Sequence, residues 1–473
     1  MKLTRHSGRL RGPRMRKKLL SILILCILVA STLVGCEQPS EQPCTLIVYS
    51  ITGGDVSVMK AGTDSWIEAE VGMSLEPGDI IRSGDNSSAE ITFIEGTTIE
   101  LETGTEIEIA SLDYSADTDS ATIGLKQTIG SIVFRVTKIV DPGSRYEVET
   151  PTSVVAVRGS AVQVYVIEDG TTWATNLEGD IWAVAQGVEL QVPEGQQCII
   201  RPDESPELIV TFLDLNLEAA IREAISKPEG VIYASDLAEL AYLSASFKNI
   251  RDLTGLECAT SLTVLWLSHN QIGDISPLAS LTSLEELWLQ SNQISDISPL
   301  GNLTRLTNLS LTFNYEISDI SPLANLTHLT GLGLSGHQIS DISLVVDLSR
   351  LIFLDLQHSQ ISDISPLASL TGLEQLWLNV NQISDISPLT NLTELTDLGL
   401  ANNQMSDISP LANLTSLTWL DLADNQITDI SPLVDNEGLS EGDKVYLTGN
   451  PLSSDSINIY IPQLEAREVI VDY

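Results

Sequence analysis

Histidine and cysteine side chains, which carry much of the nucleophilic and acid–base chemistry of proteins, are sparse in this chain. The 473 residues include five of each. Four histidines, His269, His328, His337 and His358, fall in the second half of the chain without a paired Cys or Ser nucleophile. No glycine-rich phosphate loop is present either. The sequence therefore predicts a protein that is not an enzyme, with no catalytic residues and no cofactor.

Acidic residues offer two candidate metal sites. Asp113, Asp117 and Asp119 are close in sequence, but the glycine and glutamate of a calcium-binding loop are missing. The second candidate is the carboxylate of a recurring Asp-Ile pair, at Asp274, Asp296, Asp319, Asp341, Asp363, Asp385, Asp407 and Asp429. A carboxylate at one fixed position is explained more simply as a cap for a turn. We therefore expect no metal.

The Asp-Ile pairs belong to a repeat that covers most of the second half of the chain and determines where the candidate residues of that half lie. Successive pairs are 22 residues apart, with one spacing of 23, and a fixed period of this length is typical of a solenoid. In Leu284–Leu300, Leu287 and Leu289 alternate with other residues as in a short strand with one buried face. The pattern LxxLxLxxNxIxDIxPL resembles the internalin-like leucine-rich repeat. This resemblance implies a parallel β ladder with a short helical or 3-10 convex side over residues 251–440.

Most copies of the repeat place an asparagine where the chain leaves the strand, at Asn270, Asn292, Asn314, Asn381, Asn403, Asn425 and Asn450. A buried amide there can satisfy backbone groups that would otherwise lack partners. His337 and Ser359 occupy this position in two copies, Leu344 replaces a proline, and one residue is added within Asn314–Ile317. We expect local irregularity over residues 314–360, without a break in the solenoid.

A column of residues lies between the paired leucines and is expected to point outward from the ladder. It contains several aromatic and acidic residues together with Ser310, Gly333 and Gly399, and Phe353 and Trp419 stand one column over. Exposed aromatic rings on a concave face are common anchors of binding surfaces, but stacking that stabilises the strands explains them equally well. The candidate ligand-binding surface consists of Trp266, Trp288, Phe353, Asp355, Trp377, Trp419, Asp421 and Tyr446.

Both ends of the repeat region carry segments that resemble the caps of internalin-like repeats. Residues 209–250 form the expected helical N-terminal cap, with one helix over Asp214–Lys227 and a second, capped by Ser235, through Leu240. Residues 441–473 form the expected C-terminal cap. Counting the outermost copies gives a ladder of ten strands.

Residues 46–200 predict an all-β domain, and residues 201–208 a linker. Strand alternation and glycine-centred turns recur here, and Leu75–Asp79, Glu95–Ile99 and Val157–Ser160 resemble motifs of the FecR-type domain. Arg158 is expected to be buried and paired with a strand-end carboxylate rather than to bind a ligand. FecR regulators carry a cytoplasmic anti-sigma segment, which we do not find, so we expect a spacer or recognition module in the envelope.

The first 35 residues contain eight basic residues and no acidic residue, and the apolar run Leu19–Val34 follows the basic residues. This pattern is typical of an export signal. Leu33–Cys36 resembles the bacterial lipoprotein box, which implies cleavage before Cys36, lipidation of Cys36, and a tether over residues 36–45. The alternative is an uncleaved membrane anchor. Without residues 1–35 the chain keeps 16 basic and 64 acidic residues, which argues against nucleic acid as a partner.

Three cysteines remain beyond Cys36, namely Cys44, Cys198 and Cys258, an odd number without metal-like spacing. Cys258 is expected to be buried and inert, and Cys44 could pair with Cys198. Together these patterns predict a lipid-anchored extracytoplasmic binding protein that recognises a protein or glycan on its concave surface. The alternative is a structural spacer in an envelope assembly.

Overall fold

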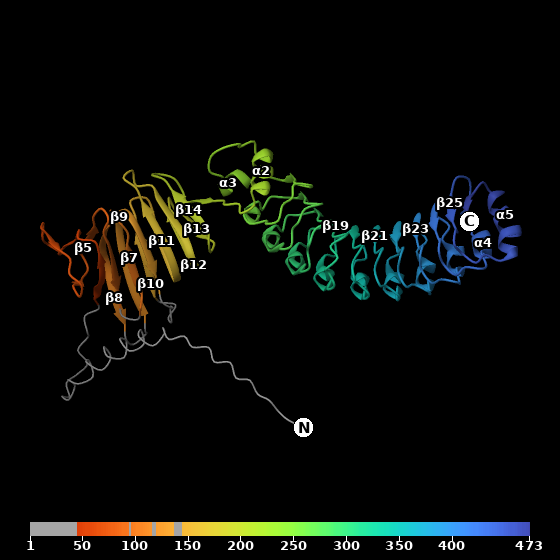
Figure 1. The fold of residues 1–473 in the computed structure, drawn as a ribbon, viewed down its shortest axis with the longest axis horizontal. Coiled ribbons are helices and arrows are strands. Elements are labelled where there is room, and N and C mark those ends of the chain that lie inside the picture. The colour runs from red at the N-terminus through yellow and green to blue at the C-terminus, as the bar shows by residue number, and fades with distance from the viewer. Residues whose placement is uncertain (1–44, 94–95, 116–119, 137–143) are drawn as a thin grey trace, which may run out of the picture. The chain divides into compact units, whose positions relative to one another are not determined.

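The structure is a computed structural model that describes residues 45–473, except 94–95, 116–119 and 137–143. The expected export signal, the lipidation site Cys36 and the possible disulfide partner Cys44 lie outside the described residues, as do Asp117 and Asp119. The described chain contains a first sheet and a second, separate sheet (Figure 1).

The first sheet is antiparallel apart from the parallel pair β9–β10. Its strands are β1 (Leu46–Thr52), β2 (Val56–Met59), β3 (Trp66–Glu68), β4 (Ser74–Leu75), β5 (Ile80–Ser83), β6 (Ser88–Thr92), β7 (Thr98–Leu101), β8 (Glu106–Ser115), β9 (Ser120–Arg135), β10 (Arg145–Glu149), β11 (Val154–Val166), β12 (Thr172–Ala185), β13 (Val188–Val192), β14 (Gln197–Ile200) and β15 (Glu207–Ile209). The alternation expected from the sequence is confirmed, because Ile99, Leu101, Ile107 and Ile109 are all buried. The last strand, β15, begins within the range expected to be a linker.

The arginine expected to be buried in this domain is instead exposed, so that prediction was wrong. Arg158 lies on β11, and its guanidinium is 5.0 Å from the ring centroid of Trp182 on β12. The buried carboxylate belongs to Asp79, whose Oδ2 is 2.6 Å from Nζ of Lys60. Burial raises the pKa of Asp79, but hydrogen bonds from Lys60 and from the backbone outweigh it and hold the pKa below its usual value.

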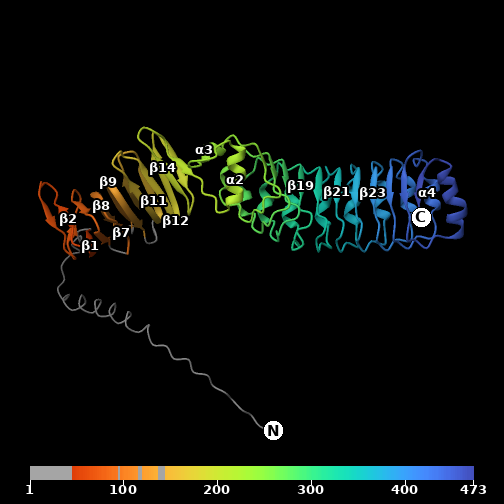
Figure 2. The same cartoon turned by 45° about the horizontal axis from the view of Figure 1, so that its top comes forward.

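The second sheet is a parallel ladder in which each strand pairs with the next along the chain (Figure 2). Its strands are β16 (Tyr242–Ser244), β17 (Val264–Trp266), β18 (Glu286–Trp288), β19 (Asn308–Ser310), β20 (Gly331–Gly333), β21 (Phe353–Asp355), β22 (Gln375–Trp377), β23 (Asp397–Gly399), β24 (Trp419–Asp421), β25 (Lys444–Tyr446) and β26 (Ile470–Asp472). The ladder therefore has 11 strands rather than the expected ten. The chain turns back after the C-terminal helices and adds β26 beside β25, which the repeat pattern does not encode.

Opposite the strands, each repeat forms one short helical turn. These turns are η1 (Leu256–Cys258), η2 (Ser276–Ser280), η3 (Ser298–Asn302), η4 (Ser321–Asn325), η5 (Ser343–Asp347), η6 (Ser365–Ser369), η7 (Ser387–Asn391), η8 (Ser409–Asn413) and the α-helical α4 (Ser431–Asp435). The Asp of each Asp-Ile pair accepts a hydrogen bond from the backbone N–H of the Ser two residues later, as Asp274 does from Ser276 at 2.8 Å. The expected turn cap is thus confirmed.

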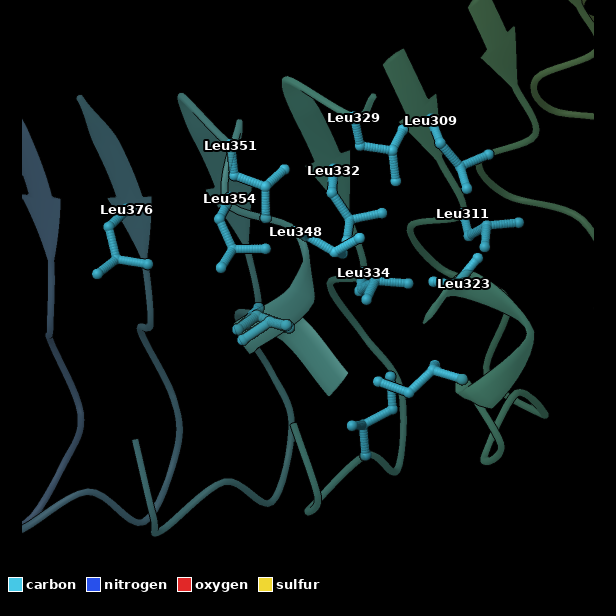
Figure 3. Close-up of a cluster of buried hydrophobic side chains, with 14 of the residues drawn as sticks. Leu309, Leu311, Leu323, Leu329, Leu332, Leu334, Leu348, Leu351, Leu354 and Leu376 are labelled. Atoms are coloured by element: carbon cyan, nitrogen blue, oxygen red, sulfur yellow. The ribbon is translucent and has the colours of Figure 1, made fainter. Parts of the chain in front are cut away.

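The interior of the solenoid is filled by leucine and isoleucine side chains from both sides of each repeat. Figure 3 shows leucines of β19, β20 and β21 pointing toward those of the convex turns, such as Leu323 and Leu348. These side chains are fully buried or nearly so. Truncating one such leucine to alanine typically costs about 2–5 kcal/mol of stability, so the periodic leucines are a main source of the stability of the ladder.

The asparagine column joins neighbouring repeats through backbone hydrogen bonds, as expected. Asn292 shows the pattern: its Oδ1 accepts from Ile272 N at 3.1 Å, and its Nδ2 donates to Leu267 O at 3.0 Å and Leu289 O at 2.9 Å. Each amide therefore satisfies groups of its own repeat and of the preceding one.

The column is interrupted within residues 314–360, which we call the irregular segment. His337 is buried in place of an asparagine, and its Nδ1 is 2.6 Å from Asn314 O. Ser359 makes a long contact of 3.4 Å with Gln357 O. These two substitutions confirm the expected local irregularity. The strand ladder nevertheless continues through β19, β20 and β21 without a break, as also expected.

Helices cover both ends of the ladder (Figure 1). At the start lie α2 (Leu215–Ala224), capped by the carboxylate of Asp214, and α3 (Ala234–Leu237). The cap of α3 is Tyr233 rather than the expected Ser235, and the helix ends at Leu237 rather than Leu240. At the far end lie the π-helical η9 (Ser456–Tyr460) and α5 (Ile461–Glu465). Ile209 of β15 and Tyr233, just before α3, form an isolated antiparallel β-bridge.

Candidate functional site

The concave face of the ladder presents two columns of side chains, one on each side of the buried middle residue of the strands, which is a leucine in β16 to β24 and Val445 in β25. Strand pairing in register places Trp266 beside Trp288 and carries the same column to Asp355, Trp377, Asp421 and Tyr446. The other column contains Phe353 and Trp419. All eight candidate residues therefore lie on one face, although they do not converge on one point.

The aromatic residues at the two ends of this face contact other rings. The ring centroids of Trp377 and Trp419 are 4.9 Å apart, and those of Trp419 and Tyr446 are 5.6 Å apart. Near the other end, Trp266 packs edge-on against Tyr242 at 5.3 Å. Such pairs contribute about 0.5–1.5 kcal/mol each beyond their buried area, so these rings stabilise the ladder.

Trp288 and Phe353 have different surroundings, because they flank a hollow that we call the concave pocket. It has a volume of about 270 Å³ and is lined by Trp288, Asn308, Leu309, Ser310, Thr312, Gly331, Leu332, Gly333, Phe353 and Asp355. Two of the buried leucines drawn in Figure 3, Leu309 and Leu332, belong to this lining. Neither flanking ring has a ring partner among the described residues.

The concave pocket exists because β20 has a glycine in both outward columns. A Cβ on Gly331 would lie 2.7 Å from Asn308 Nδ2, and one on Gly333 would lie 2.9 Å from Thr312 Oγ1. Polar side chains of the preceding repeat thus lean into the space that side chains of β20 would occupy. The outcome is a hollow with an apolar floor and a polar rim.

Among the described residues that line the concave pocket, Asp355 is the only ionisable one. Burial raises its pKa above the usual value, while hydrogen bonds from Gln357 oppose the shift. Both of these bonds, from the backbone N–H and from Nε2 of Gln357, go to Oδ1 at 3.1 Å. Asp421, three repeats further on, has a matching bond from Ala423 N and a pKa that burial also raises, but it does not line the pocket.

A second hollow of about 530 Å³ lies beside the concave face, where the asparagine column is interrupted. It is lined by Phe313, Tyr315, Gly336, His337, Gln338, His358, Ser359, Gln360 and Val380. Burial lowers the pKa of His337, and hydrogen bonding to backbone carbonyls opposes the shift. Its Nε2 is buried without a partner that satisfies hydrogen-bond geometry.

The remaining candidates show no assembled chemistry. No group of three or more His, Cys, Asp or Glu side chains in the described part of the chain is placed to hold a metal ion. Cys198 is buried, and burial raises the pKa of its thiol to about 12. Cys258 is partly rather than fully buried, which corrects the expectation, and burial raises the pKa of its thiol to about 11.

The residues that shape the concave pocket were largely missed by the sequence argument. Asn308, Thr312 and Gly331 were not among the candidates, and Gly333 was noted only as a member of the outward column. Aligning the repeats in register would have shown two glycines on one strand. A search for large side chains does not detect a site whose main feature is missing side chains.

The class of protein follows from comparisons with known families. Residues 260–302, 282–325, 349–391 and 393–435 match the family described as leucine-rich repeats (2 copies), and residues 79–181 match the FecR protein family. The chain therefore contains a FecR domain followed by leucine-rich repeats. The repeat matches omit residues 326–348, which lie in the irregular segment. Neither matched family is a catalytic one.

Among solved structures, the chain is similar to internalins. An internalin (InlF) from Listeria monocytogenes is 32% identical, over 55% of this chain and 91% of that one, with a TM-score of 0.46. Internalin C2 (InlC2) from the same organism is 34% identical, over 51% and 94%, with a TM-score of 0.40. A leucine-rich-repeat protein from Leptospira interrogans is 24% identical, over 46% and 62%, with a TM-score of 0.42. A comparison with curated proteins gives no match.

Proteins with FecR domains are typically extracytoplasmic or associated with the cell envelope. None of the helices in the part of the chain that the structure describes is long and apolar enough to span a bilayer.

Proposed function

We propose that this chain is a lipid-anchored extracytoplasmic binding protein that recognises a protein or glycan through the concave face of its leucine-rich repeats. The observation that carries the proposal is the pair Trp288 and Phe353. Both rings stand on the concave face, flank the concave pocket and lack ring partners among the described residues. Large rings that frame a hollow without stabilising each other are suited to anchoring a partner.

A structural role is the second candidate, and the C-terminal part of the face favours it. Trp377, Trp419 and Tyr446 form a continuous row of tilted ring contacts, which would stabilise the strands that carry them. If this held for the entire face, the two domains would act only as a spacer in an envelope assembly. We prefer the binding role because Trp288 and Phe353 take no part in this row of ring contacts.

The anchor in this proposal is Cys36. Its motivation is the basic segment, the apolar run Leu19–Val34 and the terminal Leu33–Cys36. Replacing Cys36 by Ser should block lipidation and processing, so that the precursor accumulates and incorporates no labelled fatty acid. Equal labelling of parent and variant, or a mature protein that starts at another residue, would refute the anchor.

The binding role is tested by crosslinking on intact cells that display the chain, followed by purification of the crosslinked partner. The double variant Trp288→Ala/Phe353→Ala should lose the partner while its melting temperature stays close to that of the parent. A matched control is Tyr165→Ala/Trp173→Ala, which removes a pair of contacting aromatic rings from the first sheet. Retention of the partner by the Trp288/Phe353 variant would place the site elsewhere, and co-purification of envelope proteins in every variant would support the spacer.

A further inference from the structure

The size of the concave pocket limits what can enter it. Its volume of about 270 Å³ is below the roughly 300–1,000 Å³ of sites that enclose whole small molecules. The pocket is open on the concave face and spans β18 to β21, which at about 4.8 Å per strand is roughly 14 Å. These dimensions suit a single side chain that projects from a larger partner lying along the ladder.

The charge of the surroundings selects the kind of side chain. In strands β17 to β25, the two outward columns contain the acidic residues Glu286, Asp355, Asp397 and Asp421 but only one basic residue, Lys444. The two hydrogen bonds that Asp355 accepts from Gln357 both reach Oδ1. No other described residue donates a hydrogen bond to Oδ2 of Asp355. The pocket wall therefore presents a partly buried carboxylate oxygen that is open to a donor.

The neighbours of Asp355 add a second preference. Phe353 lies two residues earlier on the same strand, so its ring and the carboxylate share the concave face. A guanidinium group can lie flat on an aromatic ring and pair with a carboxylate at the same time, which a hydrated ammonium does less well.

We infer that the concave pocket receives an arginine side chain of a protein partner, with its guanidinium paired to Asp355 and packed against Phe353 or Trp288. This inference rests on the proposed function and narrows it from a protein or glycan to a basic protein segment. The strongly acidic chain, with 64 acidic against 24 basic residues, would also attract such a segment over a longer range, in a way that salt weakens.

The test uses small probes and the full chain labelled with nitrogen-15. The probes are N-acetylarginine methylamide, its neutral isostere N-acetylcitrulline methylamide, and the disaccharide diacetylchitobiose. The reporter is the indole N–H resonance of Trp288, assigned by its loss in Trp288→Phe. We expect the arginine probe to shift this resonance and to bind about tenfold more tightly than the citrulline probe, as a charge-assisted hydrogen bond would give.

Two isosteric variants make the test specific. Asp355→Asn should abolish the preference for arginine over citrulline, whereas Asp421→Asn removes an equal charge from the same column and should leave the preference intact. Gly333→Val, whose Cβ would lie 2.9 Å from Thr312 Oγ1 and so crowd the lining of the pocket, should weaken binding of the arginine probe even though Asp355 is retained.

Several outcomes would overturn the inference. These are equal binding of arginine and citrulline, equal effects of Asp355→Asn and Asp421→Asn, and no shift of Trp288 with any probe. Tighter binding of diacetylchitobiose that survives Asp355→Asn would overturn it in favour of a glycan. None of these results decides the proposed function, which depends on the crosslinked partner and on the Trp288→Ala/Phe353→Ala variant.

Discussion

Two stretches of the same solenoid are built from the same repeat and yet have different properties. In the regular segment, residues 361–450, the asparagine column is continuous and the rings of Trp377, Trp419 and Tyr446 contact one another. In the irregular segment, residues 314–360, His337 and Ser359 interrupt that column, and the concave pocket and the second hollow, which contains His337, are both lined in part by this segment. The comparison indicates that conformity to the repeat supplies stability, and that departures from it coincide with candidate binding surfaces.

The largest expected effect comes from breaking the asparagine column in the regular segment. Asn403 accepts from Ile383 N and donates to Leu378 O and Leu400 O, each at 3.0 Å. Asn403→Ala would leave these buried groups without partners, and we expect a loss of about 3 kcal/mol in the free energy of unfolding. Urea denaturation followed by circular dichroism measures it.

The matched change in the irregular segment is Ser359→Ala, which removes only a long contact and should cost less than about 0.5 kcal/mol. Similar losses for the two variants would mean that this position of the repeat contributes as much stability in the irregular segment as in the regular one, which would contradict the contrast between the two segments.

A smaller effect should separate the two groups of aromatic rings. Trp419 contacts both Trp377 and Tyr446, so Trp419→Ala should lower the free energy of unfolding by about 2 kcal/mol. Trp288→Ala removes a ring without a ring partner among the described residues and should cost about 1 kcal/mol or less. If Trp288→Ala proves the more damaging change, Trp288 is a structural residue and the binding role loses its main support.

Among Asn403→Ala, Trp419→Ala and His337→Asn, the last should have the smallest effect, a gain of stability from restoring the repeat. His337→Asn replaces a buried ring nitrogen that lacks a partner by an amide that can both donate and accept, and we expect a gain of about 1 kcal/mol at neutral pH. Thermal unfolding at neutral pH measures this gain. A loss of stability would show that the irregular segment is packed around the imidazole ring.

The same variant should also remove a pH dependence. Because burial lowers the pKa of His337 below its unfolded value of about 6.5, the unfolded state binds the proton more readily. The parent should therefore lose stability as the pH falls below that value, and His337→Asn should lose less. An unchanged pH profile would mean that His337 is not the group that titrates.

Much of the solenoid could be predicted because the same pattern of residues recurs from repeat to repeat. The strand register, the Asn292-type amide bridges and the Asp274-type turn caps all follow from the period and from the need to pair buried backbone groups. The irregularity expected over residues 314–360 followed from the residues there that depart from the repeat pattern.

Features that occur once were harder to predict. Strand β26 depends on a return of the chain that no repeat encodes. Arg158 was assigned to the interior from its motif, but its place over Trp182 is set by strand pairing that alternation alone does not reveal. The concave pocket depends on Gly331 and Gly333 lying on either side of one leucine, which has meaning only once the face of each column is known.

The amide bridges have a consequence for how such a gene can change. Each bridge reaches only the adjacent repeat, as Asn403 does to Leu378, so recombination between similar DNA repeats can remove or add a 22-residue unit in frame without orphaning distant groups. Loss of a unit from the regular segment would shorten the ladder and leave the concave pocket intact. Loss of a unit between Trp288 and Asp355 would erase the pocket in a single event. Variation in length should therefore accumulate outside that interval wherever the pocket is used.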